Sequence, residues 1–227
     1  MLMSVREELF SLCNTTERNL GRIEKYIVEH SMSTEDVTYV AAKIVGDCAF
    51  EKSDFEYENH RKPKSSELVS TDLDRLFEIF FAHGLNPNAV FEEGVGLCYN
   101  VMGGLFFFDN FSVALQILKR CLEFGGNPNL MIVGETLFER VDFDVFFGAI
   151  EQGNRKKYAM WVQFWLLLIA FGGRLENGNE PIKMKSGLSI EIFKDYDLFS
   201  FELDFSKDGC KIHIFSKDSG EEVAVAE

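Results

Sequence analysis

Histidines and cysteines are the residues best suited to catalysis or metal binding in this chain, so their spacing is the first test of a chemical function. The sequence contains neither a His-x-x-x-His nor a Cys-x-x-Cys motif, and these are the spacings that bring metal ligands together. A cysteine nucleophile would also need a histidine partner. The nine residues are His30, His60, His83, His213, Cys13, Cys48, Cys98, Cys121 and Cys210. We therefore predict no catalytic residue, no metal site and no cofactor.

Phosphate-binding and acyl-transfer motifs are also missing from the sequence. Gly94-Val95-Gly96 lacks the third glycine of a dinucleotide loop, and neither a P-loop nor a Gly-x-Ser-x-Gly elbow occurs. Carboxylate pairs such as Glu92-Glu93 are expected at the surface of a chain with 37 acidic and 23 basic residues. The formal net charge of −14 repels nucleic acid, so we expect a protein partner with a basic patch.

The remaining bulk features indicate a soluble cytoplasmic protein. Five cysteines, odd in number and widely spaced, are typical of reduced thiols. The first residues show no signal peptide, and the longest apolar run, residues 160–171, is too short for a bilayer and contains Gln163. We expect no membrane contact and a monomer or weak dimer.

Apolar periodicity predicts helices over most of the chain. Leu73, Leu76, Phe77 and Phe80, for example, form one stripe. A charged stretch at about 51–66 is expected to be an exposed insertion between repeats. The predicted helices cover residues 4–13, 20–29, 33–45, 71–83, 100–108, 110–124, 137–150 and 155–171.

The last forty residues change to the alternating pattern of β-strands. Residues 199–205, 210–215 and 223–225 alternate and are separated by Asp-Gly and Ser-Gly turns, which indicates an antiparallel meander. Residues 188–193 are a further candidate strand. We therefore predict a helical region over residues 1–187 and a β-meander over residues 188–227, packed on the helix with Trp161 and Trp165.

The helical region also contains an internal repeat. Helical runs stop at Gly84, Gly125 and Gly172, which lie 41 and 47 residues apart. Asn-Pro-Asn follows the first two stops, at residues 86–88 and 127–129. Glycine supplies the left-handed backbone that ends a helix, and proline cannot continue it. Such periods indicate stacked supersecondary units, which favour a binding scaffold over a catalyst.

These units resemble ankyrin repeats. Residues 118–129 are similar to the end of an ankyrin second helix and its hairpin loop, and Gly134-Glu135-Thr136-Leu137 is similar to the Gly-Thr-Pro-Leu-His restart. The units exceed the family period of about 33 residues, and the Thr–His pair is missing. The resemblance covers residues 72–181 and implies a mainly α, ankyrin-like helix-turn-helix solenoid.

In ankyrin proteins the hairpin tips and first helices bind other proteins. The matching residues here are Phe91, Glu92, Glu93, Tyr99, Asn100, Met131, Ile132, Val133, Glu135 and Glu139. The preferred function is therefore a non-enzymatic scaffold or adaptor for another protein. Two alternatives stay open: an inhibitory binder, such as an immunity protein against a basic toxin enzyme, and an enzyme with its site at the β-meander.

Overall fold

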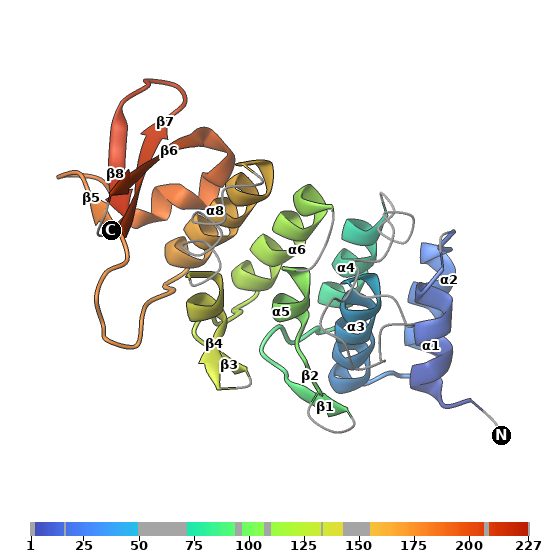
Figure 1. Cartoon of the computed structure of the whole chain (residues 1–227). Helices are drawn as coiled ribbons and strands as arrows, with labels where there is room; N and C mark the ends of the chain where they lie inside the picture. Colours follow the sequence, from blue (N-terminus) through green and yellow to red (C-terminus); the bar gives the residue numbers. More distant parts are fainter. Residues whose placement is uncertain are drawn as a thin grey trace. The chain divides into compact units, whose positions relative to one another are not determined.

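The computed structural model describes residues 3–15, 17–49, 72–93, 97–106, 110–132, 134–142, 155–206 and 209–226. Helices and small antiparallel sheets make up the structure, so the chain is mixed α and β. It divides into two compact units, Met1–Gly126 (unit 1) and Asn127–Glu227 (unit 2). Figure 1 shows the elements of each unit.

Unit 1 consists of helices and one short hairpin. The helices agree with the predicted ranges to within a few residues, because their apolar stripes repeat with the helical period. They are α1 (Val5–Cys13), α2 (Leu20–Glu29), α3 (Thr34–Ala49), α4 (Leu73–Ala82), α5 (Val101–Leu105) and α6 (Phe111–Glu123), and the hairpin strands are β1 (Phe91–Glu93) and β2 (Leu97–Tyr99).

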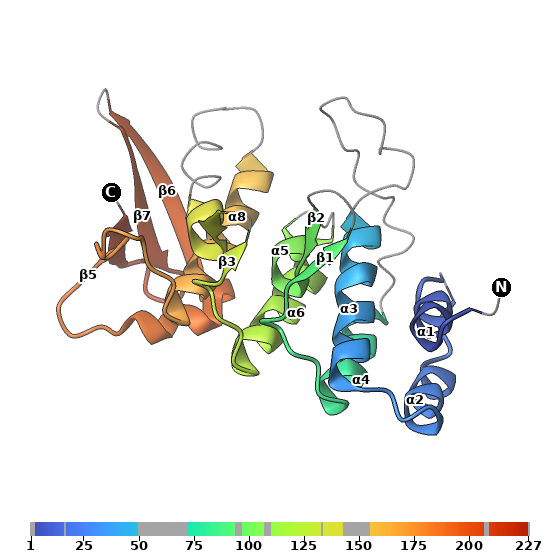
Figure 2. The ribbon, with the colours of Figure 1, turned by 90° about the horizontal axis from the view of Figure 1, so that it is seen from below.

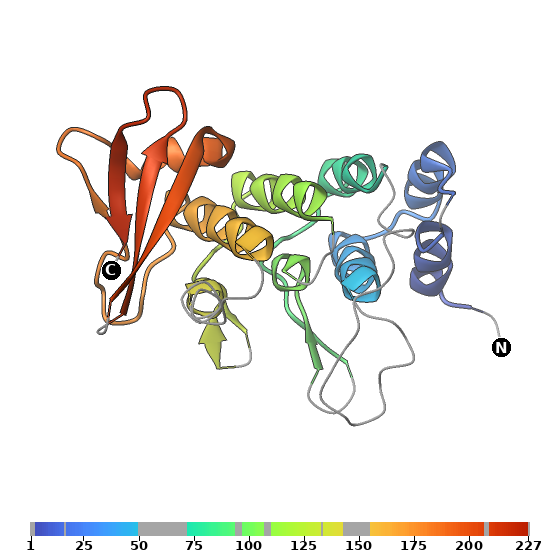
Figure 3. The same cartoon turned by 45° about the horizontal axis from the view of Figure 1, so that its top comes forward.

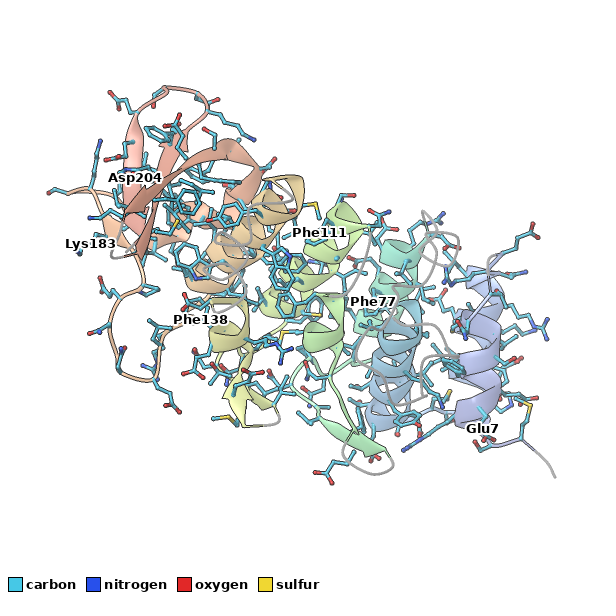
Figure 4. All side chains as sticks on the ribbon, in the orientation of Figure 1. Glu7, Phe77, Phe111, Phe138, Lys183 and Asp204 are labelled. Atoms are coloured by element: carbon cyan, nitrogen blue, oxygen red, sulfur yellow. The ribbon has the colours of Figure 1, made fainter. Side chains whose placement is uncertain are left out.

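The helices of unit 1 pack in pairs and in two rows. Contacts join α1 to α2, α3 to α4 and α5 to α6 within the pairs. Between pairs, α3 contacts both α1 and α5, and α4 contacts both α2 and α6. Figure 3 shows these two rows. The predicted stripe of α4 is buried throughout, and Phe77 lies among the helices in Figure 4.

The predicted insertion at 51–66 lies outside the described residues. The elements on either side of it can still be compared with the other pairs. Helices α3 and α4, which flank it in the sequence, contact each other as α1 and α2 do. An exposed insertion between repeats therefore stays a prediction.

The ends of four helices share one geometry. Gly84, Gly125 and Gly172 have φ values of 87°, 85° and 90°, which confirms the three predicted left-handed stops. After α6, Gly125 N–H donates to Leu122 O at 3.0 Å and Gly126 N–H to Cys121 O at 2.8 Å, the two bonds of a Schellman motif. Equivalent pairs of bonds end α4 and α8 (Arg155–Ala170), and α2 ends the same way at Ser31, with φ of 48°.

The Asn-Pro-Asn segments form turns that reach the next helix stop. In each, the first asparagine accepts a hydrogen bond from the backbone of the third, at 3.0 Å for Asn86 and 2.9 Å for Asn127. The third asparagine reaches further: Asn88 Nδ2 donates to Gly125 O at 2.9 Å in unit 1, and Asn129 Nδ2 to Gly172 O at 2.8 Å in unit 2. The repeat is thus present in hydrogen bonds as well as in sequence.

Unit 2 combines a long buried helix with two small sheets. Helix α8 packs on the 3₁₀ helix η2, and its segment Val162–Ile169 is almost entirely buried except for Gln163. Residues 137–142 are helical too, and the rest of the predicted helix at 143–150 lies outside the described residues. The elements are β3 (Met131–Ile132), β4 (Glu135–Thr136), α8 (Arg155–Ala170), β5 (Lys183–Met184), η2 (Ile190–Leu198), β6 (Phe199–Ser206), β7 (Gly209–Ser216) and β8 (Glu222–Ala226).

The larger sheet confirms the predicted antiparallel meander and corrects its boundary. Its strand order is β5-β8-β7-β6, with every neighbouring pair antiparallel. Residues 188–193 do not form a strand, because Ser189 caps the 3₁₀ helix η2 and Phe193 is buried. The fourth strand is β5 instead, and the sheet and α8 belong to one unit, so the structure does not divide at residue 187.

None of the helices in the described part of the chain combines the length and apolar composition needed to cross a bilayer.

Candidate functional site

The hairpin of unit 1 is held in place by one buried asparagine. Strands β1 and β2 pair with Phe91 opposite Tyr99. Asn100 follows β2 and caps α5 by accepting from Gly103 N–H, while its amide nitrogen donates to Pro87 O at 3.2 Å and Ala89 O at 2.8 Å. Asn100 is only 5% exposed, so it is not a surface residue and its place in the predicted binding set is corrected.

The hairpin of unit 2 is anchored by a capping box. Thr136 N–H donates to Glu139 Oε2 at 3.0 Å, and Glu139 N–H donates back to Thr136 Oγ1 at 3.1 Å. These bonds from Thr136 hold the pKa of Glu139 below its ordinary value. Glu139 also accepts from Glu176 N–H at 3.2 Å. The predicted contact residue Glu139 is therefore occupied in holding its own hairpin and helix.

Both hairpins expose an apolar side chain at the same position of the repeat. Val90 lies four residues after Asn86 and is 39% exposed, and Met131 lies four residues after Asn127 and is 51% exposed. The next residues, Phe91 and Ile132, are half-buried in both copies. Exposed apolar side chains at matching loop positions are a feature that packing inside the unit does not require.

Aromatic and cationic side chains of α1 and α3 surround the first hairpin. The Phe91 ring meets the Tyr39 ring edge-on at 5.4 Å. The Arg6 guanidinium lies 5.1 Å and Lys43 Nζ 5.7 Å from the centre of the Tyr39 ring, and Lys43 also covers Phe10 at 5.0 Å. These are cation–π contacts, which keep the two cations at the protein surface beside the rings.

Acidic groups complete the surroundings of each hairpin. In unit 1, Arg6 pairs with Glu35 at 2.9 Å and also with Asp36, and Glu92 on β1 is exposed. In unit 2, Glu135 pairs with Arg140 at 2.5 Å. The side chains of the predicted residues Glu93, Tyr99 and Val133 lie outside the described part of the structure. The structure therefore brings together Phe91 and Glu92 in unit 1, and Met131, Ile132 and Glu135 in unit 2.

Sequence reasoning missed Tyr39 and Lys43. They are four residues apart and lie on one side of α3, next to the inward positions Val40 and Ala41. That spacing is a usable signal for an amphipathic surface, but α3 is some fifty residues away from the hairpin in sequence. The contact with Phe91 becomes visible only in the folded unit.

In the described part of the chain, the titratable groups do not converge on a reactive centre. Burial raises the pKa of the Cys13 thiol to about 12 and raises that of Cys121 as well, which disfavours the thiolate at neutral pH. Burial also raises the pKa of Asp142, which accepts from Trp165 Nε1 at 3.0 Å. Among the described residues there is no group of three metal-ligating side chains.

A hollow of about 590 Å³ in unit 2 lies at the end of α8. Phe171, Arg174 and Lys194 are among its lining residues. Lys194 Nζ stands 4.8 Å from the centre of the Phe171 ring and pairs with Glu191 at 3.4 Å, so its charge is already balanced inside the hollow. The described residues that line it include no serine, threonine, cysteine or histidine.

Comparison with known protein families, curated proteins and solved structures finds no match to this chain.

Proposed function

We propose that this chain is a non-enzymatic protein-binding scaffold of ankyrin-like repeats, and that its hairpin tips contact the partner. The observation that carries the proposal is the pair of exposed apolar side chains at one repeat position, Val90 just before β1 and Met131 at the start of β3. A solvated loop has no need of apolar side chains where it enters a hairpin, whereas an interface uses them as anchors surrounded by polar groups.

Several features support the ankyrin-like part of the proposal. Helices pack in pairs and in two rows in unit 1, four helices end in the same left-handed geometry, and short antiparallel hairpins follow two of the stops. The asparagine bonds to Gly125 O and Gly172 O repeat at matching positions. Stacked units of this kind use their interior for packing and their loop tips for recognition.

The charge of the chain indicates the chemistry of the partner. A net charge of −14 repels acidic surfaces, and Glu92 stands exposed two residues after Val90. Two cations that lie beside the Tyr39 ring next to the first hairpin, Arg6 and Lys43, are in contact with aromatic rings, and Arg6 is also paired with carboxylates. The partner is therefore a protein that offers a basic patch around an apolar pocket.

The buried thiols support the non-enzymatic part of the proposal. A cysteine nucleophile needs a depressed pKa and an accessible sulfur, whereas Cys13 and Cys121 are buried with raised pKa values.

The test uses the purified chain as bait in a lysate of its source cells. We expect a basic protein to be captured by the parent chain and lost from the double variant Val90→Asp/Met131→Asp, because a charge at each anchor would be buried in the complex. The matched control is Val28→Asp, an apolar position on α2 that is 61% exposed and lies outside both hairpins. Retention of the same protein by the double variant would remove the hairpin tips as the binding site.

Binding kinetics with the captured protein separate the contribution of charge from that of the apolar anchor. Glu92→Lys should slow association, and added salt should slow it further in the parent, since steering is screened beyond about 8 Å at physiological ionic strength. Met131→Asp should act mainly on the dissociation rate. Association that does not change with salt would contradict a basic partner.

A further inference from the structure

Within the described residues, strand β6 is an edge of the larger sheet in unit 2 and pairs with a strand on one side only. It is last in the order β5-β8-β7-β6, and β7 is its neighbour among the described residues. It runs for eight residues without proline or glycine, and its register with β7 has no shift, while the bulge of this sheet lies between β7 and β8. Natural sheets commonly blunt an edge with a short strand, a proline, a bulge or charged side chains, and of these β6 has only the charges of Glu202 and Asp204. Figure 2 shows β6 and β7 running side by side.

The hydrogen bonds at the start of the hairpin show which backbone groups of β6 face the open side. Lys217 N–H donates to Leu198 O at 2.9 Å, one pair before Phe199 opposite Ser216. Ser216 turns the other way: its N–H donates to Glu221 O and its carbonyl accepts from Gly220 N–H. Bonded and non-bonded pairs alternate in an antiparallel ladder. The backbone groups of Phe201, Leu203 and Phe205 therefore point away from β7.

The side chains of the same segment divide by face. Glu202 and Asp204 lie on one face and are exposed, and Figure 4 labels Asp204 on this strand. On the other face Phe201 packs on Tyr158 of α8 at 6.2 Å, Leu203 is half-buried and Phe205 is 47% exposed. A strand laid along residues 202–205 would meet carboxylates on one face and apolar groups on the other.

Charge favours another protein over a second copy of this chain as the source of a strand that pairs with β6. If two β6 strands paired with each other about Leu203, Glu202 of one copy would lie opposite Asp204 of the other. Like charges directly opposite in a sheet are destabilising. An extended segment in which lysine or arginine alternates with apolar residues would instead match both faces of β6.

We propose that the open edge of β6, over Glu202–Phe205, binds such an extended basic and apolar segment of a partner protein by strand addition. Main-chain hydrogen bonds to the open groups of Leu203 and Phe205 supply register, and the carboxylates of Glu202 and Asp204 select basic side chains. This site is independent of the hairpin tips in the proposed function.

The first experiment measures binding of a labelled, end-capped octapeptide of alternating lysine and valine to the full chain, by fluorescence anisotropy. We expect saturable binding, no binding of the matching glutamate–valine peptide, and a loss of affinity of about tenfold or more in Glu202→Lys/Asp204→Lys. Both carboxylates are exposed, so this variant should keep its thermal stability. Equal binding of the lysine–valine peptide to parent and variant would overturn the proposal.

Hydrogen exchange tests the strand addition itself. The lysine–valine peptide should slow exchange of the Leu203 and Phe205 amides, which face the open edge, and leave the β7-bonded amides of Glu202 and Asp204 nearly unchanged. Peptide binding without this alternation would show general charge attraction only and would overturn strand addition. Protection of the same amides by concentration alone, with dimer formation, would show that a second copy occupies the edge.

A pair of substitutions at Phe205 separates main chain from side chain. Phe205→Pro removes one outward N–H at an edge position where proline is tolerated, whereas Phe205→Ala removes the ring and keeps the N–H. Strand addition requires that the proline variant bind the peptide more weakly than the alanine variant. Binding at this edge should be the same in Val90→Asp/Met131→Asp, so the failure of one proposal leaves the other standing.

Discussion

Gly125 shows how a single backbone angle defines the repeat. Its φ is 85°, and a Cβ added there would meet no atom within 4 Å. A side chain at this position would therefore cause backbone strain without any clash. Ser31 tolerates a similar angle at the end of α2, and for that reason this helix stop had no glycine signal in the sequence.

We expect Gly125→Val to lower the free energy of unfolding by about 1–2 kcal/mol, because a β-branched residue is strained in the left-handed region. The matched control is Gly21→Ala in α2, where the backbone is not left-handed and a new Cβ would lie an ordinary 3.8 Å from Asn19 Oδ1. That variant should gain up to about 1 kcal/mol, since alanine favours a helix. Urea unfolding of both measures the difference, and an unchanged midpoint for Gly125→Val would contradict the strain argument.

Tyr158 carries a polar group that the fold does not use. Its hydroxyl is buried and has no hydrogen-bond partner among the described residues, and burial raises the pKa of the group. An unsatisfied buried hydroxyl costs about 1–3 kcal/mol. Tyr158→Phe should therefore raise the unfolding free energy by about 1 kcal/mol while keeping the ring against Phe201.

The control for that variant is Tyr26→Phe, because the Tyr26 hydroxyl donates to Glu8 at 2.6 Å. This second substitution removes a real hydrogen bond and should be neutral or destabilising in the same thermal melts. If Tyr158→Phe lowers the melting temperature more than Tyr26→Phe does, the Tyr158 hydroxyl must have a hydrogen-bond partner.

At the scale of elements, the helices were predictable because their signals are local. A buried stripe such as Leu76, Phe77 and Phe80 in α4 repeats with the period of the helix, and Ser4 with Glu7 forms the predicted capping box of α1. The segment 188–193 failed because Leu188, Ile190 and Ile192 alternate as in a strand, while its backbone follows a cap at Ser189. Strand β5 has only two residues and so carries no pattern at all.

The residues of the candidate site were partly predictable for a related reason. The Asn-Pro-Asn turns that precede the two hairpins located Val90, Phe91 and Met131. A polar residue at the start of a helix can either cap that helix or contact a partner, and sequence does not distinguish the two. Asn100 and Glu139 proved to be caps in the folded units, and only the fold brings Tyr39 to Phe91.

The asparagine bonds should be measurable as stability. Asn129 donates to Gly172 O and accepts from Arg174 N–H at 3.0 Å, so Asn129→Ala leaves two backbone groups without their partner. We expect a loss of about 1–2 kcal/mol in unfolding free energy, because each net hydrogen bond contributes about 0.5–1.5 kcal/mol. Asn88→Ala, the equivalent change in unit 1, should cost a similar amount. Asn179→Ala is the control, because Asn179 donates its backbone N–H to Asn177 Oδ1 and keeps that bond in the variant.

At the scale of the whole molecule, charge opposes folding. The chain carries 37 acidic and 23 basic side chains, and like charges are brought closer together in the compact state. Exposed ion pairs such as Lys25–Glu29 and Arg120–Glu78 stabilise the folded chain against this repulsion. Each pair of this kind contributes only about 0–1 kcal/mol, so repulsion should dominate the response to salt.

We therefore expect the midpoint of thermal unfolding at pH 7 to rise when NaCl increases from about 10 mM to about 150 mM, which shortens the screening length from about 30 Å to about 8 Å. Repulsion between distant carboxylates is screened over this range, whereas a close pair such as Arg120–Glu78, at 2.8 Å, loses less of its attraction. Differential scanning calorimetry measures the midpoint, and KCl at the same concentrations controls for binding of a particular cation. A midpoint that falls with salt would mean that attraction between opposite charges, rather than the net charge of −14, governs the stability of this chain.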